Sequence, residues 1–411
     1  MIDLQHITLH KPVSAIQASI LLPASKSESN RALIIDALSG YKCTLHNLSE
    51  ARDTQTMQRL LHSAEQTLDV IDAGTTMRFL TAYIAATNQD KILTGTARMC
   101  ERPISILVDA LQKLGAEITY LKNEGFPPIH IKGIRPSGVH QIEIRGDVSS
   151  QYISALLMIA PVLPQGLTLI LTGNIGSRPY IEMTIKQMAN FGIDVSWEGN
   201  TILVKKQTYQ PATFWVESDW SGASYWYSIA ALAPQADIEL KGLKKDSLQG
   251  DSAISGIMKN LGVHTTNVEG GVRLTKTPSQ KRVAVDFTHC PDLAQTVAVL
   301  CAANHIHLTL TGIESLKIKE TDRVKALQQE LSKFGATLQE VKPETYELTR
   351  TADWQQPEYP IEIDTYDDHR MAMAFAPLAL LYPIIIQHPK VVVKSYPRFW
   401  DDLKKAGFSI Q

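Results

Sequence analysis

The residues best able to do chemistry are cations and hydroxyls grouped at a predicted helix start near the N-terminus. Ser25 and Glu28 have the S-x-x-E spacing of a capping box, which predicts a helix that begins at Ser25. Lys26 and Ser27 would lie in its first turn, where backbone N–H groups are free and the helix dipole is positive. Arg31 would share the face of Ser27. The group predicts a site for phosphate or carboxylate, although an ordinary capped helix carries similar residues.

Further cations stand at comparable places along the chain. Arg98 precedes a helix that Pro103 is expected to initiate. Lys319 and Arg323 have the spacing of one helical face, with Glu320 beside them. Two more cations of this kind are Arg370 and Lys394. Each alone could be a surface ion pair, but their repeated occurrence at such positions predicts anion binding.

Uncharged polar residues and one carboxylate complete this set. The polar residues that open two further predicted helices are Ser149, Ser150, Gln151 and Ser177. Hydroxyls and amides of this kind recognise ring hydroxyls and phosphate oxygens. Asp292 stands at the start of a buried helix, where it could be a cap. Alternatively, Asp292 and Glu320 form a base and acid pair, although nearby cations favour the ionised form of both.

Composition limits the class of protein. A chain of 411 residues with 44% hydrophobic and 20% charged residues is typical of a globular protein with two domains of about 200 residues. The net charge of −2 argues against a nucleic-acid partner. The apolar stretch Met371–Ile386 is interrupted by Pro377 and Pro383, and the start lacks a signal-peptide pattern, so no membrane is expected.

The cysteines and histidines indicate neither disulfides nor a metal. Four widely separated cysteines suit reduced thiols and a cytoplasmic location. His305 and His307 form the only close histidine pair, and their alternation is that of a strand rather than a metal site. No cofactor is expected.

A period of roughly seventy residues organises the chain. An amphipathic helix that ends in glycine and precedes a strand recurs, and its glycines are Gly115, Gly192, Gly262, Gly335 and Gly407. A polar helix start leading into small apolar residues also recurs, as in Ala155–Ala160, and helices apolar all round are buried. The expected strands include Gln141–Ile144, Leu167–Leu171, Leu308–Leu310 and Val391–Val393. These features predict six β/α units, three per domain, rather than a solenoid.

In its motifs and their order, the chain resembles the enolpyruvyl transferase family. The matching pieces are Pro23–Arg31, Ala73–Arg78, Arg98–Pro103, Ser149–Gln151, Ser177–Ile181, Pro291–Asp292, Lys319–Arg323, Asp368–Met373 and Lys394–Pro397. The resemblance implies an α/β fold of two domains, each with three repeated β/α units whose buried parallel helices point their N-termini at an interdomain cleft. It also implies that residues 23–217 form one domain and that residues 1–22 and 218–411 form the other.

The resemblance further implies an activity. Members that match these motifs transfer the enolpyruvyl group of phosphoenolpyruvate to the 5-hydroxyl of shikimate 3-phosphate, in the synthesis of chorismate and aromatic amino acids. The implied ligands of phosphoenolpyruvate are Lys26, Gly74, Arg98, Arg323, Arg370 and Lys394. Those of shikimate 3-phosphate are Ser27, Arg31, Ser149, Ser150, Gln151, Ser177 and Lys319. Asp292 would take the hydroxyl proton, Glu320 would protonate the methylene carbon, and Lys26 would assist. A monomer is implied.

Departures from the family pattern and two alternatives remain. Ala24, Cys100 and Ser315 replace a frequent Gly, Lys and Asn, and Asp72 replaces Asn beside the anion site, where it could cap a helix. One alternative is the sister branch that uses UDP-N-acetylglucosamine, which carries a cysteine in a glycine-rich loop, unlike the region of Cys100. The other is an anion-binding protein without turnover. The presence of both proposed proton-transfer residues, Asp292 and Glu320, argues against it.

Overall fold

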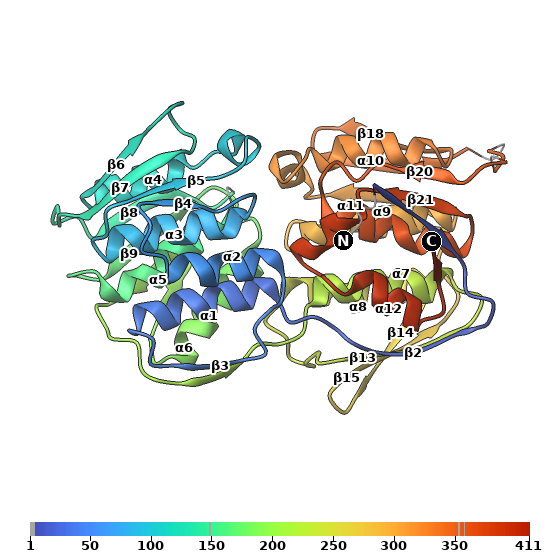
Figure 1. Cartoon of the computed structure of the whole chain (residues 1–411), viewed down its shortest axis with the longest axis horizontal. Coiled ribbons are helices and arrows are strands. Elements are labelled where there is room, and N and C mark those ends of the chain that lie inside the picture. Colours follow the sequence, from blue (N-terminus) through green and yellow to red (C-terminus); the bar gives the residue numbers. More distant parts are fainter. Residues whose placement is uncertain (1–4, 148, 352–353, 357) are drawn as a thin grey trace. The chain divides into compact units, whose positions relative to one another are not determined.

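The computed structural model describes residues 5–147, 149–351, 354–356 and 358–411. The chain divides into two compact units. Unit 1 comprises Met1–Ala24 and Glu217–Gln411, and unit 2 comprises Ser25–Val216. The N-terminal strands therefore lie among C-terminal elements, which Figure 1 shows as blue strands within the orange and red unit.

The described residues of unit 2 form two four-stranded sheets, a two-stranded sheet and six α-helices. The first sheet, in the order β4-β5-β7-β6, has the strands β4 Thr67–Asp69, β5 Lys91–Thr94, β7 Ile129–Ile134 and β6 Ala116–Tyr120. The second, β10-β11-β9-β8, has β10 Ser196–Glu198, β11 Thr201–Val204, β9 Leu167–Thr172 and β8 Gln141–Arg145. The third pairs β12 Thr213–Trp215 with β3 Thr44–His46. The helices are α1 Lys26–Leu38, α2 Arg52–Leu61, α3 Gly74–Ala86, α4 Ser105–Lys113, α5 Ser150–Ile159 and α6 Arg178–Asn190.

In the part of unit 1 that the structure describes, there are three four-stranded sheets and six α-helices. The sheet β14-β15-β13-β2 has β14 Val263–Val268, β15 Gly271–Lys276, β13 Ala236–Lys241 and β2 Ile16–Leu21. The sheet β16-β17-β19-β18 has β16 Arg282–Asp286, β17 His307–Thr311, β19 Thr345–Arg350 and β18 Ala336–Lys342. The sheet β20-β21-β1-β22 has β20 Ile361–Ile363, β21 Ile384–Gln387, β1 His6–His10 and β22 Ser409–Ile410. The helices are α7 Trp220–Leu232, α8 Ile254–Lys259, α9 Ala294–Ala303, α10 Arg323–Ser332, α11 His369–Phe375 and α12 Phe399–Lys405.

The four-stranded sheets share one pairing pattern, in which one parallel pair of strands is followed by antiparallel pairs. In four of these sheets a buried helix joins the two parallel strands, whereas all of unit 2 and then α7 lie between β2 and β13. In one example β8 and β9 are parallel, and β9 pairs antiparallel with β11. The predicted strands that begin at Gln141, Leu167 and Leu308 are confirmed as β8, β9 and β17. The five glycines predicted at helix ends all have positive φ, from +66° to +100°. At Gly115 a Cβ would also meet the carbonyl oxygen of Arg135 at 1.8 Å, so only glycine fits.

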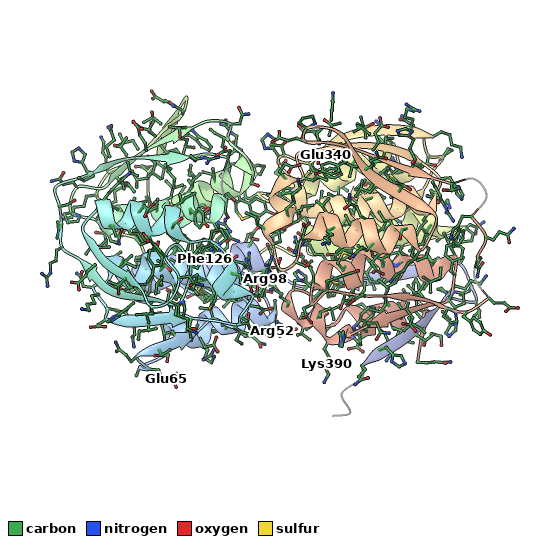
Figure 2. The ribbon with its side chains drawn as sticks, turned by 90° about the horizontal axis from the view of Figure 1, so that it is seen from above. Arg52, Glu65, Arg98, Phe126, Glu340 and Lys390 are labelled. Carbon is green, nitrogen blue, oxygen red and sulfur yellow. The ribbon has the colours of Figure 1, made fainter. Side chains whose placement is uncertain are left out.

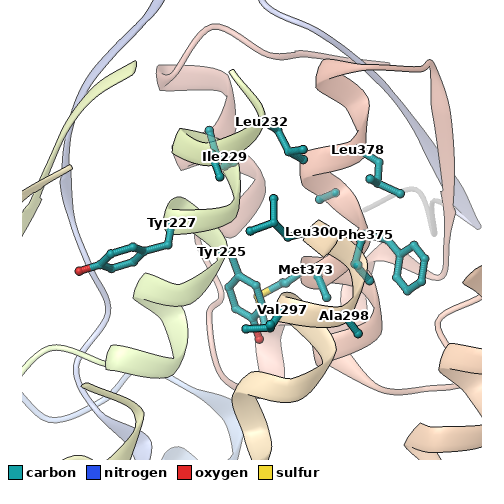
Figure 3. Packing of buried hydrophobic residues seen from close by; sticks show 14 of the residues in the cluster. Tyr225, Tyr227, Ile229, Leu232, Val297, Ala298, Leu300, Met373, Phe375 and Leu378 are labelled. Atoms are coloured by element: carbon teal, nitrogen blue, oxygen red, sulfur yellow. The ribbon is translucent and has the colours of Figure 1, made fainter. Parts of the chain in front are cut away.

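Three buried helices form the centre of each unit. In unit 2, α1, α3 and α5 contact one another, and in unit 1 α7, α9 and α11 do so. Every residue of α9 and of α11 is buried, as the apolar composition of these segments predicted. Figure 3 shows Ile229 and Leu232 of α7 packed with Val297 and Leu300 of α9, while Tyr227 points away from them. Such a bundle fixes the helix N-termini, where the polar residues lie.

Three local predictions are wrong. Val391–Val393 is not a strand but part of the 3₁₀ helix η7, Pro389–Lys394, because His388 adopts a left-handed conformation and Pro389 starts a helical turn. Lys319 and Glu320 lie outside α10, which begins only at Arg323, so they do not share a helical face with it. The helix after Arg98 begins at Ser105 rather than at Pro103. Within the described ranges, none of the helices has the length and apolarity needed to cross a membrane.

Candidate functional site

The candidate site residues fall into one cluster in each unit. We call the first the unit 1 cluster: Asp292, Lys319, Glu320, Arg323, Asp368, Arg370 and Lys394. Its centre is Arg323, the first residue of α10, whose side chain is 2% exposed. Arg323 donates from Nη1 to Asp292 Oδ1 (2.9 Å), from Nη2 to Glu320 Oε2 (2.8 Å) and from Nε to Asp368 Oδ2 (2.6 Å). The planar guanidinium thereby orients three carboxylates at once.

Arg370 is held at the start of α11. Asp368 caps this helix by accepting a hydrogen bond from the backbone N–H of Arg370 (2.9 Å), as the polar helix start predicted. The guanidinium donates from Nη2 to Asp292 Oδ2 (2.9 Å) and to Ser221 Oγ (3.3 Å), and from Nη1 to the backbone oxygen of Asp292 (3.4 Å). Asp292 thus lies between Arg323 and Arg370, and the N-terminal turns of α7 and α11 meet at Arg370.

Two lysines complete the unit 1 cluster. Lys394, at the end of η7 and 1% exposed, lies 3.3 Å through Nζ from Glu320 Oε1. Lys319 Nζ lies 3.9 Å from Asp292 Oδ1. The structure therefore brings together all six residues of unit 1 that were predicted from the sequence for the site. Its four cations outnumber its three carboxylates, a balance that suits an anionic ligand.

Asp292 is not a helix cap. It lies in the 3₁₀ helix η4, Pro291–Leu293, and α9 begins after Leu293 without a side-chain cap. Burial alone would raise the pKa of Asp292, but the charges of Arg370, Lys319 and Arg323 together hold it well below its usual range. The carboxylate is therefore ionised at neutral pH and accepts protons weakly until its cations are occupied.

The second cluster, which we call the unit 2 cluster, lies at the starts of α1, α2, α3 and α5 and in the loop before α4; its residues are Lys26, Asp53, Gly74, Arg102, Ser149, Ser150 and Gln151. Ser25 caps α1 by accepting from the backbone N–H of Glu28, which confirms the predicted helix start. Lys26 Nζ lies 3.0 Å from Oδ2 of Asp53, a buried residue of α2, and Thr76 donates to the backbone oxygen of Asp53 (3.3 Å). Lys26 keeps an 18% exposed side chain. Its ammonium is thus positioned by a carboxylate yet open to a ligand.

Gly74, the first residue of α3, lies against an arginine. A Cβ on Gly74 would meet Nη1 of Arg102 at 2.7 Å, so the missing side chain makes room for that guanidinium. Arg78 donates to the backbone oxygens of Gly74 (3.2 Å) and Pro103 (2.8 Å), which ties the start of α3 to the loop that contains Arg102. Arg98, in the same loop, is more open, with a 44% exposed side chain 3.2 Å from Glu101. Figure 2 labels Arg98 among the side chains of unit 2.

The predicted hydroxyl and amide residues also lie at helix starts. Ser149 caps α5, accepting from the backbone N–H of Gln151, and Ser150 is the first helical residue. The side-chain amide of Gln151 donates to Thr75 Oγ1 (3.2 Å), so the starts of α5 and α3 are in contact. Ser177 precedes α6 in a left-handed conformation, with φ 51°, and makes no cap hydrogen bond.

Arg31 does not converge with Lys26 and Ser27 on one exposed point. Its guanidinium is turned into unit 2 and donates to Thr184 Oγ1 (2.7 Å), Ser154 Oγ (3.2 Å) and the backbone oxygen of Ser27 (2.8 Å). The residue is 2% exposed, and burial lowers its pKa to about 10. The helical spacing placed Arg31 correctly, but it could not reveal hydroxyls contributed by α5 and α6.

Asp72 is not a helix cap either. The N-cap of α3 is Ala73, and no side chain caps it. Arg52 instead donates from Nη2 to both Asp72 oxygens, each at 2.9 Å. The carboxylate that disturbed the predicted anion site is thus neutralised by a residue that sequence reasoning missed.

Sequence reasoning missed several other residues for the same reason. Their partners are far away in the chain: Asp368 contacts Arg323 across 45 residues, and Asp53 contacts Lys26 across 27 residues. Asp368 and Arg102 lie within the motifs Asp368–Met373 and Arg98–Pro103 that match the family, and this was the one signal for them in the sequence. Among the described residues, no group of three His, Cys, Asp or Glu side chains is arranged to hold a metal ion.

Comparison with known proteins decides the family. The family model described as EPSP synthase (3-phosphoshikimate 1-carboxyvinyltransferase) matches residues 10–70 and 58–403. The chain belongs to the EPSP synthase family. A relative named 3-phosphoshikimate 1-carboxyvinyltransferase from Bacteroides fragilis is 53% identical over 401 residues, which cover 97% of each chain. A relative of the same name from Idiomarina loihiensis is 36% identical over 96% of this chain and 97% of its own.

Solved structures agree on the fold. An EPSP synthase structure from Acinetobacter baumannii superposes with a TM-score of 0.76 over 99% of this chain and 100% of that chain, at 20% identity. Another from the same organism gives a TM-score of 0.75. The predicted two-domain α/β fold of the EPSP synthase family is therefore confirmed.

Proposed function

We propose that this chain transfers the enolpyruvyl group of phosphoenolpyruvate to the 5-hydroxyl of shikimate 3-phosphate and releases phosphate, a step in aromatic amino acid biosynthesis. The relatives named for this reaction cover almost the whole chain. The observation that carries the chemistry is Asp292, a partly buried carboxylate held at 2.9 Å by both Arg323 and Arg370. An aspartate so placed can accept a proton next to a bound anion.

The substrates divide the cations and polar residues between them. Phosphoenolpyruvate is assigned to Lys26, Gly74, Arg98, Arg323, Arg370 and Lys394. Shikimate 3-phosphate is assigned to Ser27, Arg31, Ser149, Ser150, Gln151, Ser177 and Lys319. Arginine suits the planar oxygens of carboxylate and phosphate, and the exposed Nζ of Lys26 adds a point charge. The guanidinium of Arg31 is already hydrogen-bonded to Thr184 and Ser154. Arg31 therefore contributes to binding mainly by fixing the first turns of α1, which carry Ser27.

The reaction proceeds by addition and elimination. Asp292 accepts the proton of the 5-hydroxyl while the oxygen of that hydroxyl bonds to C2 of phosphoenolpyruvate. Glu320 gives a proton to the methylene carbon. In the elimination, Glu320, now a carboxylate, takes a proton back from the new methyl group as the C2–O bond to phosphate breaks; phosphate leaves with the bonding electrons, and the enol ether remains. Lys26, next to Asp53, assists proton movement. No step requires a metal or an organic cofactor.

Substrate charge prepares Asp292 for its proposed role. Without ligand, Arg370, Lys319 and Arg323 hold the pKa of Asp292 below its usual range against the effect of burial. An anionic substrate that occupies these cations raises the proton affinity of Asp292, which makes it a better base. The same anion can engage Arg323 and Lys394, the two cations that contact Glu320.

Phosphate release from phosphoenolpyruvate tests the proposal, with shikimate 3-phosphate or UDP-N-acetylglucosamine as acceptor. Release is expected with shikimate 3-phosphate alone and is lost in Asp292→Asn. Release with the nucleotide sugar alone would assign the chain to the sister activity. No release with either, but retained binding of phosphoenolpyruvate, would indicate a binding protein without turnover. We also propose that the protein is a monomer located in the cytoplasm. Analytical ultracentrifugation should then show one species with the mass of a single chain, 45.5 kDa.

A further inference from the structure

A buried carboxyl group lies behind the unit 1 cluster. Asp251 belongs to the 3₁₀ helix η3, Gly250–Ala253, and is 2% exposed. Its Oδ2 accepts a hydrogen bond from Ser221 Oγ, and its Oδ1 is buried with no hydrogen-bond partner among the residues described. A buried carboxyl group with one oxygen that lacks a hydrogen bond lowers the stability of the folded state. Such a group therefore suggests a functional role in addition to packing.

Ser221 connects this carboxyl group to the site. Ser221 is the second residue of α7, and its Oγ accepts from Nη2 of Arg370 (3.3 Å). The same Nη2 donates to Oδ2 of Asp292 (2.9 Å). A continuous chain of hydrogen bonds therefore runs from Asp251 through Ser221 and Arg370 to Asp292. Neither Ser221 nor Asp251 was among the residues predicted for the site.

We propose that Asp251, acting through Ser221, is a positioning residue for Arg370 and that its charge controls how strongly the unit 1 cluster binds an anion. Two carboxylates, Asp251 and Asp292, share one arginine. With Asp251 neutral, the positive field of Arg370 is opposed by one carboxylate fewer and is available to an anionic ligand. With Asp251 ionised, a second negative charge competes for the same guanidinium.

The surroundings of Asp251 make the neutral form accessible near neutral pH. Burial and then the charge of Asp292 raise the pKa of Asp251 to about 7, while Arg370 and the Ser221 hydrogen bond act in the opposite direction. Asp219 adds a further negative charge, and the thiol of Cys290 is another titratable group close enough to feel the charge of Asp251. Deprotonation above that pH places an additional negative charge beside the arginine. Anion binding should therefore weaken as the pH rises through about 7.

The inference rests on the proposed role of Arg370 in binding phosphoenolpyruvate. Steady-state kinetics of the full-length protein with shikimate 3-phosphate and phosphoenolpyruvate, from pH 6 to pH 9, test it. Asp251→Asn keeps the shape and removes the charge, so its KM for phosphoenolpyruvate should stay flat while that of the unaltered protein rises about 5-fold or more. Asp251→Ala and Ser221→Ala should each raise this KM about 10-fold at pH 7, with a smaller change in kcat.

A double variant tests whether Asp251 and Ser221 affect KM through the same contact with Arg370. The double variant Asp251→Ala with Ser221→Ala should be no worse than either single variant, because both act through Arg370. Asp246→Ala, an exposed aspartate upstream of η3, is the matched control and should leave KM and its pH profile unchanged. Thermal unfolding of each variant separates loss of folding from loss of positioning, and Ser221→Ala carries the test if Asp251→Ala does not fold.

The outcomes distinguish this inference from the proposed function. If Arg370→Ala raises the KM for phosphoenolpyruvate while folded Asp251→Asn keeps the ordinary pH profile, Asp251 does not control the site and the inference is wrong. If Arg370→Ala leaves that KM unchanged, the role of Arg370 itself is wrong. Additive effects of Asp251→Ala and Ser221→Ala would also overturn the relay, since they would show independent actions.

Discussion

Arg52 donates from one nitrogen, Nη2, to both carboxylate oxygens of Asp72, each at 2.9 Å. Both side chains are partly open to solvent, at 40% and 26% exposure. Asp72 precedes the start of α3, where Gly74 is assigned to phosphoenolpyruvate. A carboxylate there opposes an anion unless its charge is balanced, and Arg52 supplies that balance in this chain. Because exposed ion pairs contribute little to stability, we expect the pair to affect the affinity for phosphoenolpyruvate more than folding.

This relationship predicts a compensating pair of substitutions. Arg52→Ala should raise the KM for phosphoenolpyruvate by roughly 3- to 10-fold, because it removes the positive charge that pairs with both oxygens of Asp72, at an effective dielectric near 20. Adding Asp72→Asn should recover most of the loss. Kinetics at low and at high salt measure both effects, which should shrink as the salt concentration rises. A double variant as impaired as Arg52→Ala would show that Arg52 contributes in some other way.

Asp292→Asn should reduce kcat by at least about 100-fold, because a neutral amide cannot take the hydroxyl proton. Binding of phosphoenolpyruvate should persist or strengthen, since one carboxylate no longer competes for Arg323 and Arg370. Calorimetric titration with phosphoenolpyruvate, beside single-turnover phosphate release, measures the two quantities. Asp401→Asn, an exposed residue of α12, serves as control. Equal losses of binding and of turnover would remove Asp292 from the role of base.

Gly74→Ala should displace the guanidinium of Arg102, whose Nη1 lies 2.7 Å from the position of the new Cβ. We expect a higher KM for phosphoenolpyruvate with a modest change in stability, because the obstacle is the end of a side chain. Gly256→Ala provides the contrast, since no heavy atom lies within 4 Å of a Cβ at this exposed position in α8. It should leave kinetics unchanged and stabilise the chain by up to about 1 kcal/mol. Steady-state kinetics and thermal unfolding test both.

Arg31→Ala should lower the free energy of unfolding by about 2 to 4 kcal/mol, since it removes the buried hydrogen bonds of the guanidinium to Thr184, Ser154 and the backbone of Ser27 and leaves a cavity in unit 2. Urea titration measures the loss. The exposed Arg145, which pairs with Asp147, gives a comparison that should change by less than about 1 kcal/mol. A stable Arg31→Ala protein with impaired binding of shikimate 3-phosphate would instead favour a direct role in the site.

Stability should depend on pH through Asp251. Its pKa is raised to about 7 in the folded chain, so between pH 4 and pH 7 the folded state binds more protons than the unfolded state. Linkage then makes the free energy of unfolding fall with rising pH across this interval and level off above it. The difference between the unaltered protein and Asp251→Asn should follow that curve. A constant difference from pH 4 to pH 8 would mean that Asp251 keeps an ordinary acidity.

Local signals in the sequence predicted much of the fold. Capping residues such as Ser25 mark helix starts, and glycines such as Gly192 mark helix ends, because these positions impose demands that few residue types meet. The strand expected at Val391–Val393 does not form. The β propensity of three valines is a weak preference, and the conformations of His388 and Pro389 direct the chain into a helical turn instead.

The site was predictable only in part. Repeated motifs gathered the cations, but ion partners depend on which elements pack together. Asp251 could not be paired with Ser221, 30 residues away, from spacing alone. The inward turn of Arg31 likewise depended on hydroxyls from other helices, which no local pattern reveals.

The threading of the chain has a consequence for synthesis. Unit 2 is a single continuous segment, whereas β2 pairs with β13 and β1 with β21 and β22, the last strand of the chain. Unit 2 can therefore fold on the ribosome, while strand β1 waits on the order of 10 s or more for its neighbours to emerge. During that interval β1 and β2 are unpaired edges exposed to other nascent chains, so slow translation or scarce chaperones should aggregate this protein through its N-terminus.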